Sequence, residues 1–282
     1  MIENKIDFIA TVVVNNANPN GDPLAGNMPR TDSKGYGEMS DVSIKRKIRN
    51  RMQDLGHEIF VKSRDRVDDD HYSLESRYNE FFKGNKNDIE VEKEAMEKWL
   101  DVRSFGQVIT FDKKSIGIRG PVSVSIAKSL EPIEITSMQI TRSTNGMEPK
   151  SGKSRSADTM GTKHVAEFGT YVIYGAVNCF YAERTGFDEK DLSVIKEALR
   201  TLFINDASSA RPEGSMEVRD IFWFKHSSKI GNVSSAKIKN LLEWNNDSDM
   251  KERYENYNIH LNTEKLEEYK SLGLEVEQLE GI

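Results

Sequence analysis

The sequence predicts an α+β fold with a ferredoxin-like core, in which strands and helices follow the order β-α-β-β-α-β. Apolar, β-rich runs mark the strands, and two amphipathic segments with an apolar period near 3.6 residues mark the helices. A charged helical segment interrupts this order between residues 56 and 103. The 282-residue length and 37% hydrophobic content therefore favour one domain with insertions.

The first half of the order lies in residues 5–55. "KIDFIATVVV" (5–14) predicts a strand, and the turn-rich "NNANPNGDPLAGNMPR" (15–30) predicts an unusually long loop after it. "SDVSIKRKIRNRMQDL" (40–55) predicts a helix with Ser40 or Asp41 as its N-cap. Its apolar stripe is formed by Ile44, Ile48, Met52 and Leu55.

The second half follows the charged helical insertion at 56–103. Residues 115–130 read as a strand, and so does the long run 168–182. Residues 188–203 predict the second amphipathic helix, and 215–226 the last strand. The inward positions of this second helix are Leu192, Ile195, Leu199 and Leu202.

The charge distribution is uneven along the chain, although the net charge is −6. Residues 41–66 carry eight Lys/Arg and four Asp/Glu, a local charge of +4. Residues 137–164 carry five Lys/Arg and two Asp/Glu, a local charge of +3. Residues 241–282 carry four Lys/Arg and eleven Asp/Glu, a local charge of −7. We therefore expect a single domain at 1–240 followed by an acidic C-terminal tail at 241–282. Binding to phosphates requires local positive charge, which the two basic segments supply; ordinary solvated surfaces are the alternative.

Basic side chains flank the apolar stripe of the first helix. At 100° per residue they fall on both rims: Lys45, Arg46 and Arg49 on one side, Lys47 and Arg51 on the other. The helix N-terminus adds free backbone N–H groups and the positive end of the dipole, with the Ser43 hydroxyl in the first turn. This pattern favours a surface that binds a phosphodiester backbone.

The loop before this helix has the composition of a phosphate-binding loop. Gly21 and Gly26 permit close approach of the backbone to a ligand, and the polar groups for contacts are Asn18, Asn20, Asn27 and Arg30. The alternative is a turn-rich loop in front of a solvated basic helix. The aromatic strand signature of the ordinary RNA-recognition motif is absent, so RNA would not stack on the sheet in the usual way.

Five phrases in consistent order give the chain a family resemblance: "NPNGDPLAGNMPR", "DVSIKRKIRN", "TMGTKH", "TGFDEKDL" and "NDASSARPEGSMEVR". Together they resemble the RNA-binding backbone subunit of type I CRISPR effector complexes (Cascade), closest to type I-C, in the RAMP superfamily. The resemblance implies a modified RNA-recognition-motif palm without catalytic activity or cofactor. Its implied partners are CRISPR guide RNA, target DNA paired with the guide, further copies of the chain and other Cascade subunits.

The resemblance also assigns residues. The pattern Ser-x-Lys-x-x-x-Arg, which grips guide-RNA phosphates in this superfamily, maps to Ser43, Lys45 and Arg49, and Arg46 stands where many relatives have Gly. It implies a thumb-like hairpin at 137–167. There Met147 and Met160 would wedge between bases, and the phosphate contacts would be Arg142, Lys150, Lys153, Arg155 and Lys163.

Three residues, Arg211, Asp22 and Asp32, each have an alternative interpretation. Arg211, in "SSARPEG", either contacts RNA or holds the turn after the second helix. Asp22 and Asp32 carry an enzyme alternative, because in related type III subunits a loop aspartate supports metal-dependent RNA cleavage; carboxylates in Asn/Gly/Pro loops more often serve turns. A metabolic ferredoxin-like enzyme lacks a recognisable acid/base constellation.

The sequence does not support a metal site, a disulfide framework, a membrane span or a signal peptide. The histidines lack metal-ligand spacing, and the single Cys179 excludes an internal disulfide framework. No segment has the roughly 20 consecutive apolar residues of a membrane span, and the N-terminal run lacks the features of a signal peptide. We therefore expect a cytoplasmic, metal-free protein.

Overall fold

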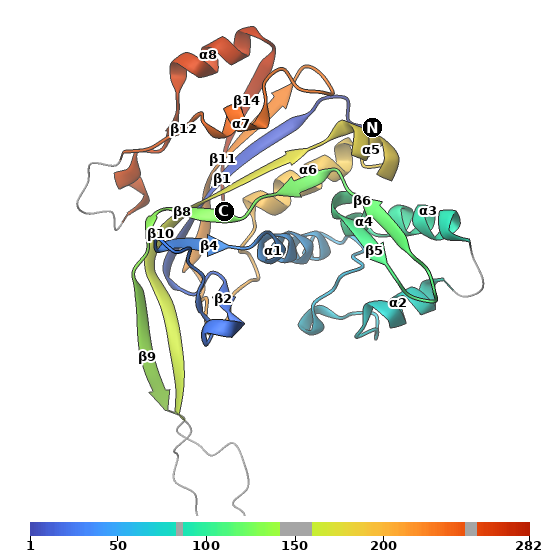
Figure 1. The fold of residues 1–282 in the computed structure, drawn as a ribbon, viewed down its shortest axis with the longest axis horizontal. Coiled ribbons are helices and arrows are strands. Elements are labelled where there is room, and N and C mark those ends of the chain that lie inside the picture. Colours follow the sequence, from blue (N-terminus) through green and yellow to red (C-terminus); the bar gives the residue numbers. More distant parts are fainter. Residues whose placement is uncertain (83–86, 142–159, 246–252) are drawn as a thin grey trace, which may run out of the picture.

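The computed structural model describes residues 1–82, 87–141, 160–245 and 253–282. A large antiparallel sheet forms the centre of the molecule (Figure 1). Its strands, in spatial order, are β14 (Leu274–Glu280), β11 (Met216–His226), β1 (Ile6–Ala17), β10 (Met160–Val177), β8 (Ala127–Pro132) and β4 (Tyr36–Met39). Two more strands also pair with β10, namely β7 (Val122–Val124) and β9 (Ile135–Thr141).

The strand β1 lies in the middle of the sheet, between β10 and β11. It is buried along almost its whole length, as expected for an apolar run with both faces covered. Phe8 lies between Gly175 and Trp223 in the register, and its ring stacks on Trp223 at 5.6 Å. A Cβ at Gly175 would lie 2.0 Å from the Phe8 ring, so only glycine fits there.

Helices cover one face of the sheet: α1 (Asp41–Asp54), α5 (Cys179–Thr185) and α6 (Glu189–Arg200). The predicted inward residues of the second amphipathic helix are all buried here, namely Leu192, Ile195, Leu199 and Leu202. In α1, Ile44, Ile48 and Met52 are buried as predicted, but Leu55 is 39% exposed. Leu55 is the C-cap of α1, where the chain turns away from the core.

The C-terminal segment covers the other face. It contains α7 (Ser235–Lys239), β12 (Leu242–Glu243), η3 (Tyr254–Tyr257), β13 (His260–Leu261) and α8 (Thr263–Ser271), and it ends in β14, which joins the sheet beside β11. Buried Tyr257, Tyr269 and Leu274 join a second core cluster with Ile9 and Phe222 of the sheet. In the described part of 241–282, these apolar anchors pack on the sheet, while most of the acidic residues between them stay exposed.

The inserted unit has its own core. It contains η2 (Arg64–Arg66), α2 (Leu74–Phe81), α3 (Asp88–Lys98), α4 (Leu100–Phe105) and the hairpin β5 (Gly106–Ile109) with β6 (Ile116–Arg119). Phe60, Tyr78 and Trp99 are buried together with Ile109 and Ile118 of the hairpin. The packing thus extends past residue 103 into the hairpin.

Three predicted strands have different bounds in the structure. The strand expected at 5–14 runs on to Ala17, into the loop expected at 15–30, and the strand expected from 168 begins at Met160. Residues 115–130 were expected as one strand, but they form β6, β7 and the start of β8, because Gly120–Pro121 and Ser125–Ile126 interrupt the run. The strand expected at 168–182 ends at Val177, where Asn178 caps α5 by accepting hydrogen bonds from Phe180 and Tyr181. Apolar content alone does not distinguish a strand from a short buried helix.

The strands β9 and the start of β10 form a hairpin that extends away from the sheet (Figure 1). The loop after β1 contains the two-residue strands β2 (Gly21–Asp22) and β3 (Met28–Pro29) with η1 (Pro23–Ala25) between them. Across the described ranges, none of the helices combines the length and apolar character needed to cross a bilayer.

Candidate nucleic-acid interface

The opening loop, residues 18–30, is a folded element. Asp22 caps η1 by accepting a hydrogen bond from the Leu24 N–H at 3.1 Å. Gly26 and Asn27 both adopt left-handed backbone conformations, with φ of 62° and 64°. A Cβ at Gly21 would lie 2.0 Å from the Asn27 side-chain oxygen, so Gly21 permits the close approach of the two sides of the loop.

This loop is tied to the start of α1. The Asn20 side-chain oxygen accepts a hydrogen bond from the Ser40 N–H at 2.8 Å. The Ser40 hydroxyl oxygen in turn accepts from the Ser43 N–H at 3.2 Å and caps the helix. The Asn20 carbonyl also accepts from the Arg30 N–H at 3.0 Å. The loop and the helix N-terminus therefore form one unit, which places Ser43 beside the loop.

The other predicted loop residues differ in exposure. Asn18 is buried, and its amide donates to the Asn27 carbonyl at 2.7 Å, so it shapes the loop from inside. Asn27 is exposed. Arg30 is half-buried and forms a 3.4 Å ion pair with Asp22. Leu24, at the tip, is 98% exposed.

Two basic residues of α1 lie on its half-buried rim. Lys45 forms an ion pair with Asp41, one turn earlier, at 3.1 Å. Arg46 hydrogen-bonds to the Asn50 side chain at 3.4 Å and forms no ion pair with any described carboxylate. Burial, together with the charge of Arg49, lowers the pKa of Arg46. An anion beside Arg46 would therefore be stabilising.

Arg49 is held by the inserted unit. Its Nε donates to Asp101 Oδ2 at 2.9 Å, and its guanidinium lies 5.0 Å from the centre of the Phe105 ring. The Arg49 side chain is 12% exposed, while Asp101 is fully buried. The structure thus gives Arg49 a fixed orientation that the helix pattern alone did not predict.

The opposite rim of α1 was predicted wrongly. Lys47 and Arg51 are buried, where exposed basic groups were expected. Lys47 pairs with Asp206 and lies over the Phe203 ring, and burial lowers its pKa. Arg51 donates to the Thr201 hydroxyl at 3.0 Å. The reason is tertiary: α6 and the turn after it pack on this side of α1.

Arg211 lies at the same turn. Its Nε donates to Asp206 at 3.1 Å, and its backbone N–H donates to the Ser208 carbonyl at 3.1 Å. One carboxylate, that of Asp206, therefore holds Lys47 of α1 and Arg211 together. Of the two expectations for Arg211, the structure shows the turn contact, and contact with RNA stays a prediction.

The hairpin carries exposed apolar side chains. Met160 is 63% exposed and Ile140 is 51% exposed. Met160 pairs with Thr141, and Gly161 with Ile140, so Met160 and Ile140 point to opposite faces of the hairpin. Lys163 pairs with Met138 on the Ile140 face. The remaining predicted thumb residues lie outside the described residues: Arg142, Met147, Lys150, Lys153 and Arg155.

The two loop aspartates are engaged in local structure. Asp22 caps η1 and pairs with Arg30. Asp32 accepts hydrogen bonds from the Lys34 N–H at 2.8 Å and from Lys128 Nζ at 2.9 Å. The Lys128 hydrogen bond lowers the pKa of Asp32. Among the described residues, no three His, Cys, Asp or Glu side chains are grouped so that they could hold a metal ion.

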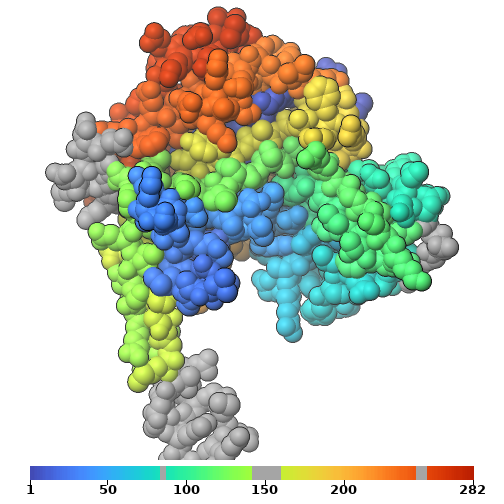
Figure 2. Space-filling view, viewed as in Figure 1, coloured from blue at the N-terminus to red at the C-terminus, as the bar shows by residue number. Residues whose placement is uncertain are grey.

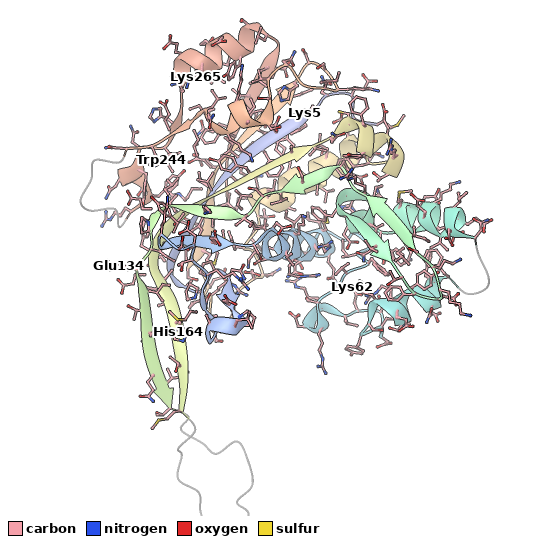
Figure 3. The ribbon with its side chains drawn as sticks, viewed as in Figure 1. Lys5, Lys62, Glu134, His164, Trp244 and Lys265 are labelled. Carbon is pink, nitrogen blue, oxygen red and sulfur yellow. The ribbon has the colours of Figure 1, made fainter. Side chains whose placement is uncertain are left out.

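These elements surround α1. Figure 2 shows an open notch between the opening loop, in dark blue, and the inserted unit, in cyan to green. In Figure 3, His164 marks the hairpin and Lys62 the inserted unit, on opposite sides of α1. The predicted rim residues Lys45, Arg46 and Arg49 belong to the helix between them.

Two residues that organise this surface were not predicted. In the segment "KWLDVRSF", the position of Asp101 among apolar neighbours is only a weak indication that this acid is buried. Asp206 lies in the phrase "NDASSARPEG", which carried part of the family resemblance, but nothing in its spacing indicates Lys47 as its partner. Both were missed because their partners lie 52 and 159 residues away in the chain.

The chain is similar to known proteins in sequence and in fold. The protein family described as CRISPR-associated protein Cas7 matches residues 4–262. A relative of that description from Haloferax volcanii is 24% identical over 271 residues, which cover 87% of this chain and 76% of the relative.

Similar folds occur in a solved CRISPR RNA-guided surveillance complex captured before nicking (TM-score 0.50, 18% identity, 78% of this chain and 75% of that chain). A second CRISPR RNA-guided surveillance complex gives a TM-score of 0.48 at 18% identity, over 78% of this chain and 68% of that chain. Since the family match spans most of its length, the chain belongs to the Cas7 family of CRISPR-associated proteins.

Proposed function

We propose that this chain is a non-catalytic backbone subunit of a type I, closest to type I-C, CRISPR surveillance complex in the cytoplasm. It binds CRISPR guide RNA, repeats along it as further copies, and presents it for pairing with target DNA. Membership of the Cas7 family supports this proposal, and so does the similar fold found in a CRISPR RNA-guided surveillance complex.

The observation that carries the proposal is the pair Arg46 and Arg49. Burial lowers the pKa of Arg46, the nearby charge of Arg49 lowers it as well, and Arg46 forms no ion pair with a described carboxylate. Asp101 balances Arg49, but a half-buried guanidinium without such a partner, as at Arg46, is costly unless an anion meets it. A phosphodiester backbone supplies anions at regular intervals, and the α1 N-terminus adds backbone donors at Ser43.

We further infer a ferredoxin-like palm. The order β11-β1-β10-β8 corresponds to strand order 4-1-3-2 of a βαββαβ unit, with α1 and α6 on one face. The other face, which RNA-recognition domains use for base stacking, is covered here by described residues of 233–245 and 253–274. RNA is therefore expected at the edge formed by α1, the opening loop and the hairpin.

The hairpin β9–β10 is the proposed thumb. It extends beyond the palm and carries exposed Met160 on one face, which fits contact with bases, and half-buried Lys163 on the other, which fits contact with a phosphate. A subunit that repeats head to tail needs two different contact surfaces. The hairpin supplies one, and the neighbouring copy supplies the other.

Titration of the purified chain with two unrelated single-stranded RNAs of equal length tests the proposal. We expect equal affinities and a steep decrease of affinity with salt, since phosphate contacts carry no sequence information. Light scattering with longer RNA should show mass increasing in steps. Absence of RNA binding at low salt would contradict the proposed function.

The enzyme alternative, metal-dependent RNA cleavage through Asp22 and Asp32, has weaker support. Each carboxylate serves a turn in its own segment and an ion pair, Asp22 with Arg30 of the same loop and Asp32 with Lys128 of β8. Their contacts are those of structural residues, and the test of cleavage is given in the Discussion.

A further inference from the structure

Asp101 of α4 is a fully buried carboxylate with three hydrogen-bond donors around it. Its Oδ1 accepts from the Phe60 N–H at 2.7 Å, and its Oδ2 accepts from the Val61 N–H at 3.1 Å and from Arg49 Nε at 2.9 Å. Two backbone N–H groups therefore fix the carboxylate before Arg49 is considered. A carboxylate held in this way is a rigid acceptor.

Arg49 contacts this acceptor through one edge only. Its Nε is used by Asp101, and the guanidinium lies over the Phe105 ring. The Nη1 and Nη2 groups make no hydrogen bond within the described part of the chain. They are also not among its fully buried, unpartnered polar atoms, so both keep contact with solvent.

The geometry of guanidinium makes this arrangement informative. Arginine carries five N–H donors in a planar fork, so one edge can be anchored while the other binds a phosphate with two parallel bonds. Lysine presents its three donors from one point, so an ammonium group held by the carboxylate cannot also give a phosphate two parallel bonds. The side-on contact with Asp101 thus orients Arg49 without using the donors best suited to phosphate.

We propose that Asp101 is a positioning residue for RNA binding, which holds Arg49 so that its Nη1 and Nη2 groups meet a guide-RNA phosphate. The inference rests on the proposed function and adds to it a role for the inserted unit. That unit supplies Asp101, both backbone donors to it and the Phe105 ring. The insertion therefore fixes one phosphate contact of α1 from outside the helix.

A competing role makes the opposite prediction. If Asp101 merely neutralises Arg49, the Asp101→Asn substitution would remove a negative charge and tighten RNA binding. If Asp101 positions Arg49, the same substitution weakens binding, because the amide presents an N–H group or a weaker acceptor to Nε and the fork loses its orientation. The sign of the change distinguishes the two roles.

The experiment measures RNA affinity over a range of salt concentrations for the full chain and four variants: Asp101→Asn, Arg49→Ala, Arg49→Lys and the double variant Asp101→Asn/Arg49→Ala. We expect each single variant to weaken binding about tenfold or more and to lower the salt slope by about 0.7, one single-strand phosphate contact. The double variant should be no weaker than Arg49→Ala, since both changes remove the same contact.

Asp69→Asn is the matched control. Asp69 pairs with Arg77 inside the same inserted unit at 2.6 Å and does not contact α1. It should lower the melting temperature and leave the salt slope unchanged. Arg49→Lys leaves Asp101 and its backbone donors intact, so it tests the fork even if Asp101→Asn fails to fold.

The outcomes separate this inference from the proposed function. If the unmodified chain does not bind RNA, the function is wrong. If it binds RNA and Arg49→Lys matches its affinity, or a folded Asp101→Asn binds equally or more tightly, the positioning role is wrong and the function stands. Weaker binding by both, with non-additivity in the double variant, supports the role of Asp101.

Discussion

The side-chain oxygen of Asn20 accepts a hydrogen bond from the Ser40 N–H at 2.8 Å, which ties the opening loop to the N-cap of α1. The contact spans 20 residues and aligns two potential phosphate-binding elements. A loop of this length without such a tie would lose conformational entropy when RNA binds. The tie therefore pre-organises the surface.

Asn20→Ala should weaken RNA binding with little change in fold. The substitution removes one hydrogen bond and leaves the Ser40 N–H without its acceptor, at a cost of about 1–3 kcal/mol. Titration of RNA, with circular dichroism as a check on folding, measures the effect. Asn15→Ala is the control, since Asn15 is exposed, has no left-handed backbone, and accepts its side-chain hydrogen bond from the neighbouring Asn16. Equal affinities for both variants would show that the tie has no role in binding.

Lys45→Ala should lower the slope of log affinity against log salt by about 0.7, and equally for unrelated RNAs. The reason is that Lys45 lies on the α1 rim and its ion pair with Asp41 is partly exposed, so it can exchange that partner for phosphate. Lys93→Ala is the control, because Lys93 forms an exposed ion pair with Glu97 on α3, and this substitution should leave the slope unchanged. A loss that depends on RNA sequence would contradict phosphate binding by Lys45.

Asp22→Ala and Asp32→Ala address catalysis. The unmodified chain with Mg²⁺ or Mn²⁺ should leave a complementary RNA intact, because both carboxylates are engaged in turns. Gel electrophoresis of labelled RNA after prolonged incubation measures this. Cleavage that disappears in either variant would establish the enzyme alternative.

Met160→Ala and Ile140→Ala form a matched pair on the hairpin. Both side chains are more than half exposed, so neither change should alter stability by more than about 0.5 kcal/mol. Met160 points to one face and Ile140 points to the other, which it shares with Lys163, so the pair tests which face inserts an apolar side chain between bases. We expect Met160→Ala to change the nuclease-protection pattern of bound RNA and Ile140→Ala to leave it unchanged. The reverse result would assign the wedge to the other face.

Much of the fold was predictable because its signals are local. The apolar run of β1, the cap at Ser40 and the stripe of α6 depend on residues within one or two turns. The end of β10 and the start of α5 could not be predicted, because the segment "VNCFYA" is compatible with a strand and with a buried helix. The structure shows that Asn178 caps α5 and ends the strand. The packing of the acidic C-terminal segment depends on Tyr257 and Leu274 meeting a distant sheet, and no local signal carries this.

The sequence by itself determined the family, the main strands and helices, and the basic character of α1, because composition, periodicity and motifs are properties of neighbouring residues. Only the tertiary structure decided which basic groups face solvent. Lys47 and Arg51 are covered by α6 and its following turn, whereas Lys45 stays on the rim. Arg49 is oriented by a carboxylate from the insertion. A helical pattern gives the direction of a side chain, and the partner that it meets there is set by elements far away in the chain.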